Sequence, residues 1–217
     1  MINIDKYDFF IFDCDGVILD SNKLKSNAFA KALPDEPLDL VAEFVEYHKE
    51  NGGISRYEKF KYYFEKMKNQ DAAELEIVNA LNNFASIVSK ELEECEFISG
   101  VLEFIVELTK KDKTLYVVSG SDQEELIKVF IKRGINHYFS EIYGSPDDKF
   151  ANTDKVVQSI GLNKDGVFFG DSKSDYKAAK KYGLDFLFIN GSSEWLDGKN
   201  IIDEQFTFKD FSSLRCL

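Results

Sequence analysis

The stretch Tyr7–Ser21, with the sequence YDFFIFDCDGVILDS, determines how the rest of the chain is interpreted. The apolar run Phe9–Phe12 is too short for a helix, and its aromatic and β-branched side chains favour a buried strand. Asp13 follows this run directly, and Asp15 comes two residues later. Alternation along an extended chain places both carboxylates on one side and Cys14 on the other. The stretch therefore predicts a core strand that ends in two carboxylates facing one spot.

Two carboxylates that share one location repel each other, which raises the pKa of one of them or calls for a cation between them. Mg²⁺ is a hard cation with oxygen ligands, and it meets this need. The alternative for the sequence Asp-x-Asp-Gly at residues 13–16 is a strand-end turn with two solvated acids. The motif alone leaves both interpretations open, so other parts of the chain have to decide between them.

A long helical segment follows this first strand. For roughly 75 residues after Ser21, strand patterns give way to apolar residues at helical spacing. Pro34 ends the first predicted helix, Gly52-Gly53 separate the second from the third, and Ser55 with Glu58 has the pattern of a capping box. The predicted helices cover Lys23–Leu33, Leu40–His48, Ser55–Met67 and Asp71–Leu92. Residues 22–96 are therefore predicted to form a small helical bundle inserted after the first strand.

The second half of the chain alternates strands with helices. The predicted strands are Thr114–Val118, Asp165–Gly170 and Phe186–Ile189, and helices are predicted around residues 101–108, 123–133 and 153–160 and up to Gly183. Such alternation indicates a parallel, doubly wound sheet. A final short element is expected around residues 206–214. The predicted fold class is therefore α/β, a doubly wound parallel sheet with an α-helical insertion.

Polar residues follow two of these later strands. Ser119, Gly120 and Ser121 offer hydroxyl and backbone N–H donors, which suit a phosphate. The alternative is that Ser119 or Ser121 is an ordinary N-cap of the next helix. Asp171 and Asp175 lie four residues apart across a strand–loop–helix junction, so their carboxylates can converge on one cation. Because ligands of such sheets bind at the carboxyl ends of the strands, we expect all of these groups at one crevice.

These motifs resemble, in order, those of the haloacid dehalogenase-like (HAD) superfamily of phosphoryl-transfer enzymes. Residues 13–21 match the first motif, D-x-D-G-[TV]-[LI]-x-D-[ST], Ser119 matches the second, and residues 170–175 match the fourth, G-D-x-x-x-D. The third motif is a lysine, often in a Gly-Ser-Pro-x-x-Lys context, which points to Lys149, with Lys155 as its competitor. The resemblance covers nearly the whole chain. It implies a catalytic core of residues 1–21 and 97–217 and an α-helical C1 cap over residues 22–96, similar to β-phosphoglucomutase and phosphoglycolate phosphatase.

The resemblance also implies roles for these residues. Asp13 would be the nucleophile, Asp15 the general acid and base, and Ser119 and Lys149 would hold the phosphoryl oxygens. Mg²⁺ would be held by the carboxylates of Asp13 and Asp171 and by the backbone carbonyl of Asp15. Asp175 would either bind the ion directly or contact its ligands. Gly16 and Gly120 are expected among the substrate-binding residues.

The predicted cap carries further candidates for substrate binding. Arg56 lies in the first turn of a predicted helix, where a guanidinium beside free N–H groups suits an anion. Residues 53–56 also resemble the Gly-x-Ser-Arg loop with which β-phosphoglucomutase-like proteins bind the non-transferring phosphate. The alternative is a solvated arginine beside a helix cap. Lys25 is a second candidate, at a position where that family usually has a histidine. The two histidines, His48 and His137, are interpreted as structural or solvated.

The expected function is the Mg²⁺-dependent hydrolysis of a small phosphorylated metabolite, a sugar phosphate or phosphorylated small acid, through an aspartyl-phosphate. One alternative is a β-phosphoglucomutase-like phosphomutase, against which Lys25 in place of histidine argues. Another, from a different class, is a regulator that binds a phosphorylated ligand without turnover.

Composition limits the partners of the 217-residue chain. Its 27 basic and 39 acidic residues give a net charge of −12, and the sequence pI is about 4.7. This disfavours binding to nucleic acid or to an anionic membrane, because both need basic contacts. Cys14, Cys95 and Cys216 have neither zinc-site spacing nor an even number, so a reducing environment is expected. No signal peptide or membrane-spanning run is apparent. We expect a cytoplasmic protein, a monomer or weak dimer.

Overall fold

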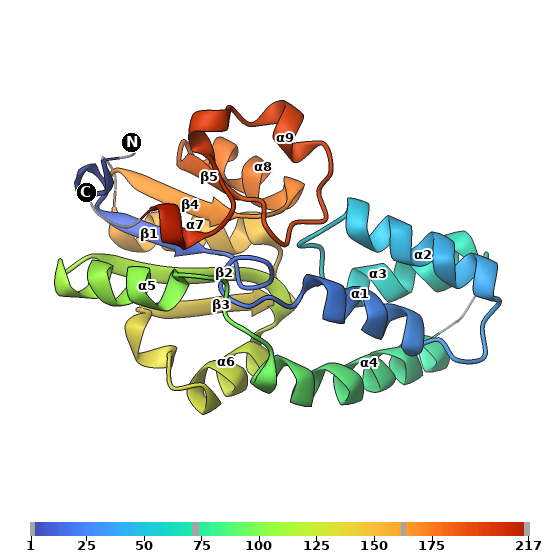
Figure 1. The fold of residues 1–217 in the computed structure, drawn as a ribbon. Coiled ribbons are helices and arrows are strands. Elements are labelled where there is room, and N and C mark those ends of the chain that lie inside the picture. The colour runs from blue at the N-terminus through green and yellow to red at the C-terminus, as the bar shows by residue number, and fades with distance from the viewer. Residues whose placement is uncertain (1–2, 71–73, 162–163, 215–217) are drawn as a thin grey trace.

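A six-stranded sheet forms the centre of the molecule (Figure 1). The computed structural model describes residues 3–70, 74–161 and 164–214. All paired strands run parallel, in the order β3-β2-β1-β4-β5-β6. The strands are β1 Phe9–Phe12, β2 Thr114–Asp122, β3 Glu141–Ser145, β4 Gly166–Gly170, β5 Asp185–Ile189 and β6 Thr207–Phe208. The predicted parallel α/β fold is confirmed, and β1, which Asp13 follows directly, lies inside the sheet.

Side-chain alternation explains why helices cover both faces of this sheet. Phe10 and Phe12 of β1 join a core cluster with residues of α5 and α6, whereas Phe9 and Ile11 join a second cluster with α7 and α8. Both faces are therefore apolar, as expected for a parallel sheet buried between two layers of helices. The helices are α1 Asn22–Lys31, α2 Leu38–Glu50, α3 Arg56–Tyr62, α4 Glu74–Glu94, α5 Val101–Lys110, α6 Gln123–Lys132, α7 Lys149–Ile160, α8 Lys173–Lys181 and α9 Gly198–Ile201.

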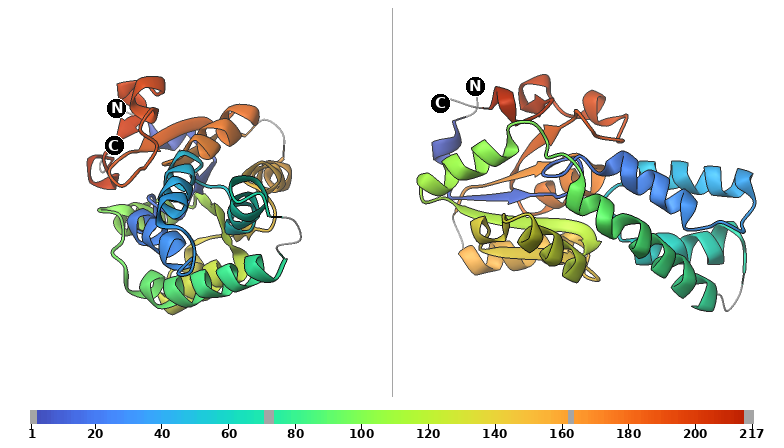
Figure 2. Two further views of the ribbon diagram at one scale, coloured as in Figure 1. Left: turned by 90° about the vertical axis from the view of Figure 1, so that its right-hand side faces the viewer. Right: turned by 60° about the horizontal axis from the view of Figure 1, so that its bottom comes forward.

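Helices α1 to α4 form a separate group, which we call the helical insertion. It lies beyond the carboxyl ends of the strands, at the right of Figure 1, while both chain ends lie at the opposite side. A cluster of aromatic rings packs its interior, with centroids 4.4–6.0 Å apart among Phe29, Phe44, Phe60 and Phe84. Figure 2 shows the four helices around this interior from two further directions. The insertion therefore has apolar packing of its own and faces the edge of the sheet where the predicted site lies.

Most of the predicted elements have the expected type, and several bounds differ. The third helix begins after the predicted N-cap Ser55, whose hydroxyl accepts from the Glu58 N–H, and a π-helical turn continues it to Met67. Helix α7 begins at Lys149 and not at the predicted Thr153, because Asp148 caps it. The predicted start of the fourth helix at Asp71 lies outside the described residues.

The C-terminal segment completes the sheet. The predicted element at residues 206–214 comprises the two-residue strand β6 and a 3₁₀ turn at Phe211–Ser213. Trp195, to which the sequence gives no role, packs with its ring centroid 5.4 Å from that of Phe188. Cys14 and Cys95 are free thiols, while Cys216 lies outside the described residues. Within the described ranges, no helix combines the length and apolarity needed to span a bilayer.

Candidate active site

The carboxylate cluster around Asp13 lies where β1 and β4 end. The Asp13 N–H donates to the carbonyl of Phe169 at 2.9 Å, which carries the strand pairing up to the sheet edge. Asp13 Oδ2 lies 2.8 Å from the Nζ of Lys149, which also contacts Asp175. Carboxylate oxygens of Asp13, Asp171 and Asp175 lie within 4.8 Å of one another, and all three residues are buried. The first, third and fourth predicted motifs therefore meet at one point.

The carboxylates of this cluster are buried with too little positive charge beside them, and this favours their protonated forms. Burial and the Asp175 carboxylate raise the pKa of Asp13 to about 7, although Lys149 acts to lower it. Burial and Asp13 likewise raise the pKa of Asp171 well above its ordinary value. Burial alone would lower the pKa of Lys149, but Asp13 and Asp175 hold it above its ordinary value, so the ammonium keeps its charge. One ammonium therefore faces three carboxylates.

A divalent cation suits this set of donors. Three carboxylates and one ammonium leave two negative charges in a buried place, where uncompensated charge is costly. Mg²⁺ prefers hard oxygen ligands of this kind. The Asp15 carboxylate is not part of the cluster, which is compatible with the prediction that Asp15 would offer only its backbone carbonyl. The residues present thus fit the expected metal.

Asp15 belongs to a second network beside the first. Its carboxylate accepts from Ser21 Oγ at 2.5 Å, from Lys25 Nζ at 2.7 Å and from Ser121 Oγ at 2.7 Å. Burial alone would raise the pKa of Asp15, but Lys25 and these hydroxyls bring it below its ordinary value. The structure therefore places the predicted substrate-binding Lys25 on the predicted acid–base residue, where it stabilises a carboxylate.

The two candidate lysines of the third motif have different surroundings. Lys149 is the first residue of α7 and is 3% exposed, against the Asp13 carboxylate. The side chain of Lys155 is 45% exposed and pairs with Asp147 at 2.6 Å. Only Lys149 reaches the cluster, so the geometry favours it for the predicted role.

The end of β2 contradicts the alternative interpretation in which a serine caps the next helix. The strand continues to Asp122, whose carboxylate accepts from the Glu125 N–H at 2.9 Å and caps α6. Ser119 is fully buried, and its Oγ accepts from the Ser121 N–H at 3.1 Å. The capping interpretation of Ser119 and Ser121 is therefore wrong. Ser121, which had no further role in the prediction, lines the cavity at the cluster.

Close backbone approach explains two of the predicted glycines. Gly16 has a φ of +75°, and a Cβ there would lie 2.3 Å from Asp171 Oδ2. A Cβ on Gly120 would lie 2.2 Å from the carbonyl oxygen of Gly53 in the insertion. Gly53 itself has a φ of +78°, and its Cβ would lie 2.9 Å from Lys149 Nζ. The loop before α3 is thus seated directly on the predicted active site.

Arg56 lines the same cavity and already has acidic partners. Its Nη1 donates to Glu125 at 2.8 Å, and its Nη2 lies 3.9 Å from Asp122. Asp122 ends β2 and Glu125 lies in the first turn of α6, so these contacts join α3 to the edge of the sheet. The predicted contact between Arg56 and a substrate stays a prediction.

Sequence reasoning missed several residues of the cavity wall, including Asn22, which donates to Asp171 at 2.6 Å. It also missed Lys59 and the position of His48, which are buried together in the wall that the insertion provides. Two signals were available. Lys59 lies three residues after Arg56 on one helix face, and His48 continues the buried spacing of Val41 and Phe44. His137, by contrast, is exposed as expected.

Comparisons with known proteins agree with this geometry. The family profile described as haloacid dehalogenase-like hydrolase matches residues 10–189. No curated protein matches the chain significantly. A predicted phosphoglycolate phosphatase from Haemophilus somnus has a similar structure, with a TM-score of 0.77, 20% identity and 98% of each chain covered. β-Phosphoglucomutase from Clostridium difficile has a TM-score of 0.72 at 18% identity, over 96% of this chain and 93% of its own. A Bacillus subtilis protein described as a HAD-hydrolase bound to magnesium has a TM-score of 0.68 at 19% identity, over 96% and 97%.

Proposed function

Because the chain belongs to the haloacid dehalogenase-like hydrolases, we propose that it is a Mg²⁺-dependent phosphatase of small phosphate monoesters. The observation that carries this proposal is the Asp13 carboxylate, which is buried against Lys149 and lies within 4.8 Å of two further carboxylates at the edge of a parallel sheet. That arrangement offers an anionic nucleophile and a cation to neutralise an incoming phosphoryl group. The helical insertion is proposed to be the cap over this site.

In the first step, an Asp13 oxygen attacks phosphorus, an O–P bond forms, and the bond from phosphorus to the ester oxygen breaks. Lys149 stays at the nucleophile and reduces its repulsion with the phosphoryl oxygens. Ser119, with the N–H groups beside it, is proposed to hold the remaining oxygens. Asp15 gives a proton to the departing oxygen, and the alcohol leaves.

In the second step, water attacks phosphorus, its proton goes to Asp15, and the bond to Asp13 breaks to release phosphate. Lys25 and the two hydroxyls favour the ionised form of Asp15 in the free protein. A phosphate dianion beside Asp15 has the opposite effect, because a like charge raises the pKa of a carboxyl. We infer that substrate binding supplies the proton affinity that the acid role requires.

The metal belongs to the same proposal. The Asp13, Asp171 and Asp175 carboxylates and the backbone carbonyl of Asp15 would hold Mg²⁺. When bound, it supplies positive charge that lowers the repulsion between the nucleophile and the phosphate.

A β-phosphoglucomutase-like activity is the second candidate. The loop at Gly53 closes directly on Gly120, and Ser174 Oγ donates to the Gly52 carbonyl at 3.0 Å. A closed cap of this kind would favour transfer to a sugar hydroxyl over transfer to water. Lys25, in place of the family's histidine, argues for the phosphatase.

A panel of phosphate monoesters with Mg²⁺ tests the proposal. We expect release of inorganic phosphate that stops in excess chelator and returns with added Mg²⁺. Release that continues in chelator would refute the metal requirement. Isomerisation of hexose 1-phosphates without net phosphate release would assign the mutase activity.

A further inference from the structure

Lys59 is a buried lysine that has no carboxylate partner among the described residues. It lies on α3, is 2% exposed, and forms part of the cavity wall. Within the part of the chain that the structure describes, no carboxylate oxygen lies within 4 Å of its Nζ. Its Nζ contacts the Nδ1 and the backbone carbonyl of His48, at 2.7 and 3.4 Å. Burying an ammonium in this way is costly, and such a cost is often retained where a ligand compensates it.

The contact with Lys59 determines which nitrogen of His48 carries the proton. An ammonium only donates hydrogen bonds, so Nδ1 of His48 must accept, and in the neutral ring Nε2 then carries the N–H. Burial and the Lys59 charge lower the pKa of His48, which keeps the ring neutral. Nε2 is buried and has no hydrogen-bond partner among the described residues. The nearest acid, Glu194, lies 3.9 Å away and is 2.8 Å from Ser26 Oγ.

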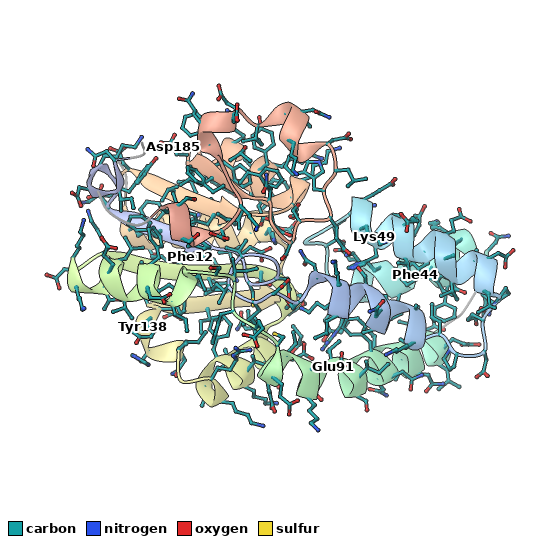
Figure 3. All side chains as sticks on the ribbon, viewed as in Figure 1. Phe12, Phe44, Lys49, Glu91, Tyr138 and Asp185 are labelled. Carbon is teal, nitrogen blue, oxygen red and sulfur yellow. The ribbon has the colours of Figure 1, made fainter. Side chains whose placement is uncertain are left out.

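Two donors are therefore available in one wall of the cavity. Lys59 has three N–H groups, of which two face His48, and His48 offers Nε2–H. Lys49, at the end of α2, lines the same cavity (Figure 3). The wall that faces the Asp13 cluster thus combines positive charge with unused donors, whereas Arg56 already has Glu125 as its partner.

We propose that Lys59 and His48 form a subsite for a second anionic group on the leaving portion of the substrate. The substrate class is then a phosphate monoester that also carries a carboxylate or a second phosphate. This proposal rests on the proposed phosphatase function for the site of transfer. Lys59 and His48 would select the substrate, and the Asp13 cluster would act on it.

The experiment compares matched esters on matched variants. The esters are phosphoglycolate, ethane-1,2-diol bisphosphate and, as the control, ethyl phosphate, which has no second anionic group. The variants are Lys59→Met, which keeps an unbranched side chain and removes the ammonium, and Lys61→Met on the exposed side of the same helix. We expect the ratio of kcat/KM for phosphoglycolate to that for ethyl phosphate to fall about 10- to 150-fold in Lys59→Met, as for a lost charge-assisted hydrogen bond. Lys61→Met should leave the ratio unchanged. A response to the bisphosphate alone would identify the second group as a phosphate.

Three outcomes would overturn the proposal: an equal loss on all esters, no change relative to ethyl phosphate for either phosphoglycolate or the bisphosphate, or a fall in these ratios for Arg56→Met and not for Lys59→Met. The last would return the subsite to Arg56. A binding measurement tests the subsite independently of whether the protein is a phosphatase. Calorimetry of phosphoglycolate, the bisphosphate and ethyl phosphate on Asp13→Asn proteins, with and without Lys59→Met, requires no turnover. We expect the same loss of preference there, and an unchanged preference would contradict the subsite even if the wild-type protein hydrolyses neither ester.

Discussion

At Asp13, burial and charge oppose each other. The residue is 3% exposed and shares its surroundings with Asp171 and Asp175, while Lys149 is the one ammonium that pairs with the cluster among the described residues. A buried carboxylate set of this kind takes up protons unless a cation is present. The raised pKa values of Asp13 and Asp171 follow from that imbalance. The same imbalance makes the site receptive to a divalent cation.

Lys149 and Lys155 provide a matched pair at this scale. We predict that Lys149→Met lowers kcat by at least about 10²-fold, because an electrostatic contact to the reacting group is lost. Lys155→Met should change kcat less than about twofold, since the side chain is exposed and paired with Asp147. Steady-state kinetics on one ester suffices. If Lys155→Met were the more damaging change, the third motif would have to be reassigned.

The pKa of Lys59 gives a prediction on pH dependence. Burial, and then Lys25, lower this pKa to about 7. Lys149 and the neutral His48 ring also face the ammonium, and Asp15 and Glu194 attract it. The Lys59 side chain is therefore mostly charged below about pH 7 and mostly neutral above it. The preference in kcat/KM for phosphoglycolate over ethyl phosphate should therefore fall as pH rises from 6 to 8.5.

The ratio of the two esters isolates this titration, because ionisations of the Asp13 cluster affect both substrates alike. Lys59→Met should give a ratio that does not vary with pH. A wild-type ratio that stays flat from pH 6 to 8.5 would contradict the assignment of the charge to Lys59.

Residues with a fixed local spacing were the predictable part of the site. Asp13 and Asp15 follow one strand, and Asp171 and Asp175 span one junction, so short-range geometry places each pair at the same edge of the sheet. Of the first pair, the Asp13 carboxylate joins the cluster with Asp171 and Asp175, whereas the Asp15 carboxylate binds Lys25 and two hydroxyls. Lys59 and His48 meet only because α2 and α3 pack against each other. Their amino-acid types give no sign of burial, and charged residues on helices are usually exposed. Tertiary packing is what their role depends on.

At the scale of elements, the loop that precedes α3 controls the fit between the insertion and the sheet. Gly53 lies against Lys149, and its carbonyl lies against Gly120. Tyr57 Oη donates to Asp122 at 2.6 Å, and Arg56 pairs with Glu125. The first turn of α3 is thereby fixed to the end of β2 and the start of α6.

Gly53→Ala tests this seating, and Gly134→Ala is its control. Both glycines have positive φ, +78° and +71°, so both substitutions introduce similar backbone strain. Only at Gly53 would the new Cβ meet neighbours, namely Lys149 and Ser174. We expect Gly53→Ala to lower kcat/KM at least about tenfold, and Gly134→Ala less than about twofold. Backbone strain should cost each variant about 1 kcal/mol in stability, and Gly53→Ala should lose more because its Cβ displaces Ser174 and Lys149. Equal kinetics in the two variants would show that the loop does not have to close.

Element types were predictable here, and several ends were not. Periodicity identifies β1 and the helices of the insertion. At α6 and α7, however, Asp122 and Asp148 take the capping positions, because an aspartate directly before a helix accepts its free N–H groups well. Strand β6 has only two residues and pairs at the sheet edge, so no alternating pattern exists to indicate it.

For the whole molecule, the parallel sheet brings motifs that are far apart in sequence to one edge, under the insertion (Figure 1). The chain carries a net charge of −12, yet Lys25, Lys59 and Lys149 lie in or beside this cavity. The positive charge needed for an anionic substrate is therefore concentrated at this cavity.

Mg²⁺ should stabilise the folded chain, because its ligands come together only on folding. At about 100 times its dissociation constant, the expected gain is about 2.7 kcal/mol, which is seen as a rise in Tm. Asp171→Asn removes one carboxylate and should abolish most of the rise. Thermal melts with and without Mg²⁺ make the measurement. The same rise in wild type and Asp171→Asn would place the cation elsewhere.

The central claim is that Asp13 is the nucleophile of a phosphatase, and phosphate release by wild type and Asp13→Asn on one ester tests it most directly. An amide of the same shape cannot attack phosphorus, and it removes a charge from a crowded cluster, so the variant should fold at least as stably as wild type. We predict Mg²⁺-dependent release by the wild-type protein and none above background by Asp13→Asn. A folded Asp13→Asn protein that still releases phosphate at a substantial rate would contradict the account.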